Sequence, residues 1–161
     1  MIKLITGKKG TGKTKVLIDM INDAVKSTNG DLICIEKGAK LTYDISYKVR
    51  LVDAERFNVS GYDSFYGFVA GMLAGNYDIK EIFVDSILKI GGTDFDEFGI
   101  MLESWTSLQA MTHRLFSQFQ LIMKNCLQVL QNLPINKKSI DNKRRFVYNR
   151  ICAVSYTHLT L

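Results

Sequence analysis

The sequence is poor in cysteine and proline and has no long apolar segment. It contains three cysteines and one proline among 161 residues. Cys34, Cys126 and Cys152 are widely spaced and odd in number, which favours free thiols in a reducing cytoplasm over a disulfide framework. Without about 20 consecutive apolar residues we expect no membrane span, and a strand beginning beside Met1 leaves no place for a signal peptide. We therefore expect a cytoplasmic protein with one domain.

Glycine and charge are unevenly distributed along the chain. All 12 glycines precede residue 100, whereas every glutamine and the single tryptophan and proline follow residue 103. Residues 1–103 carry a net charge of −2, and residues 104–161 carry +7. Such an abrupt change in composition predicts a domain boundary near Ser104.

The most informative stretch is GKKGTGKT at residues 7–14. It fits the phosphate-binding pattern G-x-x-x-x-G-K-[ST], the Walker A motif or P-loop. Residues 1–6 form a short apolar segment typical of a buried strand, and residues 15–25 have apolar side chains at helical spacing. A glycine-rich turn between a strand and a helix is the setting that the motif requires, although such a turn can also precede a helix by chance.

The residue types of this stretch suit a triphosphate. Its glycines allow successive backbone N–H groups to face inward, and the following helix adds the positive end of its dipole. Lys13 is predicted to reach the β- and γ-phosphates as the catalytic residue, and the Thr14 hydroxyl to hold Mg²⁺. The predicted nucleotide-binding residues are Gly7, Lys8, Lys9, Gly10, Thr11, Gly12, Lys13, Thr14 and Lys15.

A second stretch, residues 81–85, reads EIFVD and has the form of a Walker B strand. Asp85, at its end, is predicted to hold Mg²⁺ opposite Thr14, directly or through water. Ser86 follows where many hydrolytic P-loop ATPases have a water-activating glutamate. The sequence therefore predicts binding and leaves hydrolysis open.

The remaining segments of residues 1–103 complete an alternation of strands and helices. Residues 32–35 and 49–52 are predicted strands, the first of them joined to the N-terminal strand by a parallel, right-handed crossover. Glu36 and Lys37 then lie at the ligand-binding edge of the sheet, either approaching the nucleotide or as solvated loop charges. The aromatic stripe that begins at Phe65 predicts a helix packed on the sheet, and Asp94 or Thr93 is predicted to cap a helix through residues 95–102.

Residues 104–161 allow two interpretations. At face value, residues 105–130 form a long amphipathic helix, followed by a basic patch that suggests an interaction or nucleic-acid-binding tail. Alternatively, the tail is a frame-shifted translation: possible codons read one nucleotide earlier allow an apolar strand and a polar loop between Leu115 and Leu127. Residues 154–161 resemble translated sequencing-adaptor read-through. The second interpretation assigns residues 104–161 to a helical, basic, non-native tail, so nucleic acid is not an expected partner.

Over residues 1–103, the P-loop and Asp85 resemble the P-loop NTPase superfamily, and the chain is similar to small bacterial ATP-binding proteins of that group. The resemblance implies an α/β fold of three layers, with a parallel sheet and flanking helices, incomplete here at the C-terminus. It also implies ATP and Mg²⁺ as ligands. The guanine-reading Asn/Thr-Lys-x-Asp pattern is absent from residues 1–103, which favours ATP over GTP.

Three functions remain open on the sequence. The first is a slow ATPase or nucleotide-dependent switch that acts on an unidentified protein partner. The second is a kinase that passes the γ-phosphate to a small molecule or nucleotide, although Arg50 and Arg56 are its only arginines before residue 104. The third is a partition-type ATPase, in which Lys8 would reach a dimer partner's nucleotide, but Lys9 stands where that family has glycine.

Overall fold

The computed structural model describes residues 2–6, 10–38, 40–112, 120–124 and 151–155. Its centre is a six-stranded sheet with the order β3-β2-β4-β5-β1-β6. Every pairing between neighbouring strands is parallel. The strands are β1 (Ile2–Thr6), β2 (Asp31–Glu36), β3 (Val49–Asp53), β4 (Ile79–Val84), β5 (Gln120–Lys124) and β6 (Ile151–Ser155).

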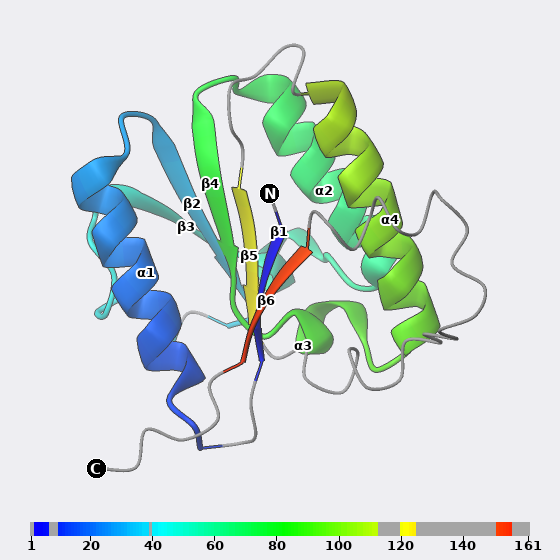
Figure 1. The fold of residues 1–161 in the computed structure, drawn as a ribbon, viewed down its shortest axis with the longest axis horizontal. Helices are drawn as coiled ribbons and strands as arrows, with labels where there is room; N and C mark the ends of the chain where they lie inside the picture. Colours follow the sequence, from blue (N-terminus) through cyan, green and yellow to red (C-terminus); the bar gives the residue numbers. More distant parts are fainter. Residues whose placement is uncertain (1, 7–9, 39, 113–119, 125–150, 156–161) are drawn as a thin grey trace.

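Helices cover both faces of this sheet, which gives three layers (Figure 1). Among the described helices, α1 covers one face, whereas α2 and α4 lie side by side over the opposite face. The described helices are α1 (Lys13–Ser27), α2 (Tyr62–Gly75), α3 (Ile87–Gly91), α4 (Phe95–Thr112) and the 3₁₀ turn η1 (Ala54–Phe57). The predicted α/β class, with a parallel sheet between helices, is confirmed.

The direction of the chain through the sheet explains which face each helix covers. From β1 the chain moves to β2 and then outward to β3, and α1 and the loop after β2 lie on one face. From β3 it returns to β4 and β5, and α2 and α4 lie on the other face. Crossover connections between parallel strands have one hand, so reversing the direction of travel moves the connection to the opposite face.

Two apolar cores result, one on each face of the sheet. Side chains alternate along each strand, so in β1 Leu4 enters the core under α2 and α4 whereas Ile5 enters the core under α1. In α2, Phe65 and Val69 are fully buried, and Tyr66 stacks edge-on against Trp105 of α4 with ring centroids 5.1 Å apart. The aromatic stripe of α2 therefore packs in the core, as its spacing predicted.

The start of α4 also follows its sequence. The Asp94 carboxylate accepts hydrogen bonds from the backbone N–H groups of Asp96 (2.9 Å) and Glu97 (3.1 Å). These two donors lie in the first helical turn, where no intrahelical acceptor is within reach. Asp94 is thus the N-terminal cap that the sequence predicted.

The prediction of one helix over residues 105–130 is wrong. Helix α4 ends at Thr112, and β5 begins at Gln120 and lies between β4 and β1. The adjacent residues Ile122 and Met123 are both buried, one in each core, which requires the alternation of a strand between two apolar layers. A short apolar run of this kind fits a strand or a helix equally well by periodicity.

The proposed boundary at residue 103 falls inside α4, which continues without a break through Trp105. Trp105 is buried in the larger core, and Leu108 packs against that core. The frame-shifted origin of residues 104–161 stays a prediction. Its basic patch lies outside the described residues.

Hydropathy of the described helices gives one further result. None of them is both long and apolar enough to cross a membrane.

Candidate functional site at the carboxyl edge of the sheet

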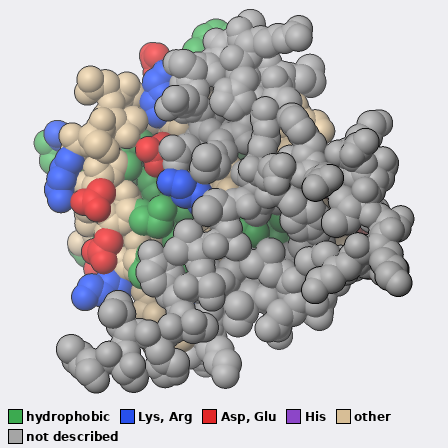
Figure 2. Space-filling view, in the orientation of Figure 1, with side chains coloured by type: hydrophobic (Ala, Val, Ile, Leu, Met, Phe, Trp, Pro, Cys, Tyr) green, Lys and Arg blue, Asp and Glu red, His purple; other side chains and the backbone are tan. Residues whose placement is uncertain are grey.

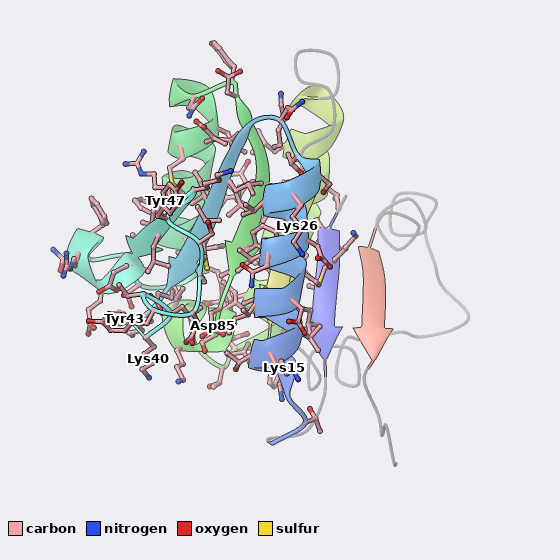
Figure 3. All side chains as sticks on the ribbon, turned by 90° about the vertical axis from the view of Figure 1, so that its left-hand side faces the viewer. Lys15, Lys26, Lys40, Tyr43, Tyr47 and Asp85 are labelled. Carbon is pink, nitrogen blue, oxygen red and sulfur yellow. The ribbon has the colours of Figure 1, made fainter. Side chains whose placement is uncertain are left out.

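The carboxyl ends of the parallel strands meet at one edge, and those predicted site residues that the structure describes lie toward it. Figure 3 shows Lys15, Lys40, Tyr43 and Asp85 toward this edge, whereas Lys26 lies at the far end of α1. Ligands of parallel α/β sheets bind outside this edge. Along the outer side of α1, Lys side chains are interspersed with Asp side chains (Figure 2), so the charge of the helix surface is mixed.

The glycine-rich loop joins β1 directly to α1. Gly10 has φ +88° and Gly12 has φ +74°, and α1 begins at the next residue, Lys13. Such left-handed conformations are costly for residues with a Cβ, which explains glycine at both positions. Among the described residues other than its neighbours in the chain, no atom lies within 4 Å of a Cβ placed on either glycine, so these residues leave open space beside the loop backbone. Gly7, Lys8 and Lys9 lie outside the described residues.

The other predicted phosphate ligands occupy the loop and the first turn of α1. Lys13 is half-buried, whereas Thr11, Thr14 and Lys15 are exposed. The first intrahelical bond runs from the N–H of Val16 to the Gly12 carbonyl, at 3.1 Å. The structure thus places Lys13 and Thr14 together at the N-terminal end of a 15-residue helix, where the dipole is positive.

Asp85 follows β4 directly and is 8% exposed. Its backbone N–H donates to the Ile35 carbonyl of β2, at 2.8 Å. Asp85 therefore shares the carboxyl edge with the glycine-rich loop, but β5 separates β4 from β1. At about 4.8 Å between neighbouring strands, the axes of β1 and β4 lie about 10 Å apart. The sequence did not predict this intervening strand.

Ser86 forms a tight corner immediately after Asp85. It is 7% exposed and has φ +58°, a left-handed conformation that few non-glycine residues adopt. The corner turns the chain from β4 into α3, whose first residue is Ile87. A serine cannot supply a carboxylate base at this position.

Glu36, at the end of β2, is 1% exposed. Its carboxylate accepts hydrogen bonds from the backbone N–H groups of Lys40 (3.0 Å) and Leu41 (3.2 Å). Burial raises the pKa of Glu36 above its ordinary value and the negative charges of Asp85 and Asp53 raise it further, although the two hydrogen bonds act in the opposite direction. Of the two predicted roles for Glu36, the solvated loop charge is wrong. The Glu36 side chain is buried, and its carboxylate bonds the backbone of the loop that follows it.

The loop of residues 37–48, which follows Glu36, is held at further points. Lys37 Nζ donates to the Lys89 carbonyl at 2.9 Å, and the Gly38 N–H donates to the Asp53 carboxylate at 2.9 Å. Leu41 is buried in the core under α1. Sequence reasoning missed this organisation, because the partners of Lys37 and Gly38 lie 52 and 15 positions away.

Two aromatic side chains project from the same loop. Tyr43 is 99% exposed and Tyr47 is 93% exposed. Figure 3 places Tyr43 beside Lys40 at the carboxyl edge, whereas Tyr47 lies toward the start of β3. The sequence left residues 43–47 undecided between a helical turn and an extended piece; the structure has turns there.

No group of three or more His, Cys, Asp or Glu side chains with the geometry of a metal site occurs in the described part of the chain. A magnesium ion that is bound with a nucleotide needs only one or two protein ligands, because phosphates and water supply the rest. Thr14 and Asp85 offer a hydroxyl and a carboxylate, which are oxygen ligands of the kind that magnesium takes. The described residues form no protein cage for a metal alone.

Comparisons with known proteins add no assignment. No model of a protein family matches the chain, and no curated protein sequence matches it either. The function therefore has to be argued from the carboxyl edge itself.

Proposed function

We propose that this protein is a P-loop nucleotide-binding protein that binds ATP with Mg²⁺ and acts as a nucleotide-dependent switch with slow hydrolysis. One observation carries the proposal: the loop between β1 and α1 has Gly10 and Gly12 at positive φ, and Lys13 opens the helix. A triphosphate needs many donors converging on one point, and backbone N–H groups free of Cβ crowding supply them.

The side chains at this edge take complementary roles in the proposal. Lys13 would neutralise the charge of the β- and γ-phosphates, and Thr14 and Asp85 would hold the magnesium ion. Lys8 and Lys9 add general attraction for phosphate. We place the protein in a reducing cytoplasm, which suits its three widely spaced cysteines.

The residue after Asp85 favours a switch over rapid turnover. ATP hydrolysis needs a group that orients or deprotonates water, and Ser86 lacks the carboxylate that serves this purpose after the aspartate in many hydrolytic P-loop ATPases. A protein that holds its nucleotide for long periods can signal the bound state to an unidentified protein partner.

Calorimetric titration of the full chain with ATP and with AMP, both with excess Mg²⁺, tests the proposal. AMP carries the same base and ribose but lacks the β- and γ-phosphates. We expect one ATP per chain and an affinity for AMP that is at least about tenfold lower, since one charge-assisted hydrogen bond contributes about 1.5–3 kcal/mol. Equal affinities, or no heat with ATP, would refute it.

A further inference from the structure

At the carboxyl end of β2, the connections that follow two neighbouring strands, β2 and β4, turn to opposite faces of the sheet. The loop after β2 crosses to the α1 face, where Leu41 enters the smaller core. The chain after β4 enters the opposite core through Ile87. Ligand sites of open parallel sheets lie where adjacent connections leave to opposite faces. Glu36 and Asp85 stand at this point, on neighbouring strands.

We propose that Glu36 is a positioning residue that couples magnesium-nucleotide binding at Asp85 to the loop of residues 37–48. The inference rests on the proposed function, because it takes the magnesium nucleotide as the ligand of Asp85. It adds a structural response to that ligand and identifies the segment that responds.

The strand register brings Glu36 and Asp85 together. Ile35 of β2 pairs with Val84 of β4, so the next residues of the two strands are Glu36 and Asp85. Both side chains are buried, and two negative charges in a poorly solvated place repel each other more strongly than they would in water. A magnesium ion at Asp85 supplies the positive charge that relieves this repulsion.

The same carboxylate holds the loop. Glu36 accepts from the N–H groups of Lys40 and Leu41. A cation at Asp85 that relieves the repulsion between the two carboxylates holds the Glu36 carboxylate in place, and with it the first turn of the loop. By linkage, a tightened loop also binds the magnesium nucleotide more strongly.

Asp53 provides a natural control within the same loop. Its carboxylate accepts from the N–H of Gly38 at 2.9 Å and from that of Glu55 at 3.0 Å, so it too anchors residues after β2. Asp53 ends β3, which lies on the side of β2 away from β4. It holds the loop but stands one strand farther from Asp85.

The loop also carries exposed side chains that a protein partner can contact. Lys40 and Tyr43 are exposed next to the two backbone N–H groups that Glu36 holds. Tightening or loosening this turn changes how firmly both side chains are presented. Lys40 and Tyr43 lie toward the same edge as Asp85 (Figure 3), so the proposed coupling connects the buried carboxylates to the outside of the protein.

Hydrogen exchange of the full chain, measured by mass spectrometry on peptides from residues 37–48, tests the inference. With saturating Mg-ATP we expect the exchange of these peptides in the wild-type protein to slow by at least about fivefold, the lower end of usual coupling between sites. Glu36→Gln keeps the shape and an acceptor oxygen but removes the charge, and it should abolish most of this response. Asp53→Asn should speed exchange in the loop yet keep the response to Mg-ATP.

Calorimetry on the same samples separates the possible failures. Wild-type protein that binds Mg-ATP without a change in loop exchange would overturn the coupling and leave the proposed function standing. An undiminished response in Glu36→Gln, or equal losses in Glu36→Gln and Asp53→Asn, would also overturn it, because the carboxylate would then act only as a structural anchor. Absence of Mg-ATP binding would overturn both proposals.

Discussion

Two loops leave the same edge of the sheet and are built in opposite ways. The loop between β1 and α1 depends on backbone conformation: Gly10 and Gly12 have positive φ, and the space beside them is open. The loop of residues 37–48 depends on side chains: Glu36, Lys37 and Asp53 hold its backbone through specific hydrogen bonds. The first loop leaves room for a ligand, whereas the second fills its own interior.

This difference assigns separate tasks to the two loops. A loop with open space and converging N–H groups suits direct contact with phosphate. A loop anchored to buried carboxylates suits transmission, because a change of charge at those carboxylates alters the contacts that define the loop. Substitutions that affect only one of these mechanisms separate the two loops experimentally.

The largest expected effect comes from a methyl group on the first loop. Gly12→Ala introduces no clash with the described residues, since apart from its chain neighbours none of them lies within 4 Å of the new Cβ, but it forces alanine to φ +74°. We expect the free energy of unfolding to fall by about 1–2 kcal/mol. Urea denaturation measures it. ATP affinity should fall too, because the methyl group occupies the space that the proposal gives to phosphate.

Gly71→Ala is the matched control for this change. Gly71 lies within α2, and a Cβ there likewise meets no atom within 4 Å. With ordinary helical dihedral angles, alanine should raise stability by about 0.5–1 kcal/mol. If both variants shifted stability in the same direction, the conformational account of the glycine loop would be wrong.

A smaller effect is expected at Glu36, and it depends on pH. Because the folded-state pKa of Glu36 lies above the unfolded value, the folded protein binds more protons between the two pKa values. The free energy of unfolding contributed by this group therefore falls as pH rises through that interval. Glu36→Gln, without nucleotide, should be more stable than wild type above the interval, with an advantage that shrinks as pH falls through it.

Thermal melts of both proteins from about pH 4, near the ordinary pKa of a carboxyl group, up to about pH 8 measure that advantage. Asp53→Asn serves as the comparison, since exchanging its carboxylate for an amide weakens the bonds from Gly38 and Glu55 and should lower stability. If the difference in stability between Glu36→Gln and wild type were the same at every pH, the raised pKa of Glu36 would be contradicted.

The same contrast between the two loops explains which features of the structure could be predicted from the sequence. Glycine at residues 10 and 12 encodes a local backbone conformation, so the motif located the turn and the helix after it correctly. Asp94 at the start of α4 was predictable for the same reason, because its partners lie two and three residues away. Local rules act through neighbouring residues, and these elements obey them.

Contacts between distant residues were not predictable in this way. The proximity of Glu36 to Asp53 and Asp85 requires β2, β3 and β4 to be neighbours, and that order depends on the whole sheet. Strand β5 was missed because its apolar run continues the helical spacing of the preceding residues, and only burial on both sides distinguishes it. Its position between β1 and β4 then sets the separation of the glycine loop from Asp85.

The central claim is that Lys13 at the start of α1 binds the phosphates of Mg-ATP, and one pair of titrations tests it most directly. Lys26 lies in the last turn of the same helix, where its exposed side chain contacts Asp23 at 3.2 Å. Calorimetry with Mg-ATP should show about 10- to 100-fold weaker binding for Lys13→Ala, from the loss of a charge-assisted hydrogen bond, and unchanged binding for Lys26→Ala. Equal affinities for the two variants would contradict the account.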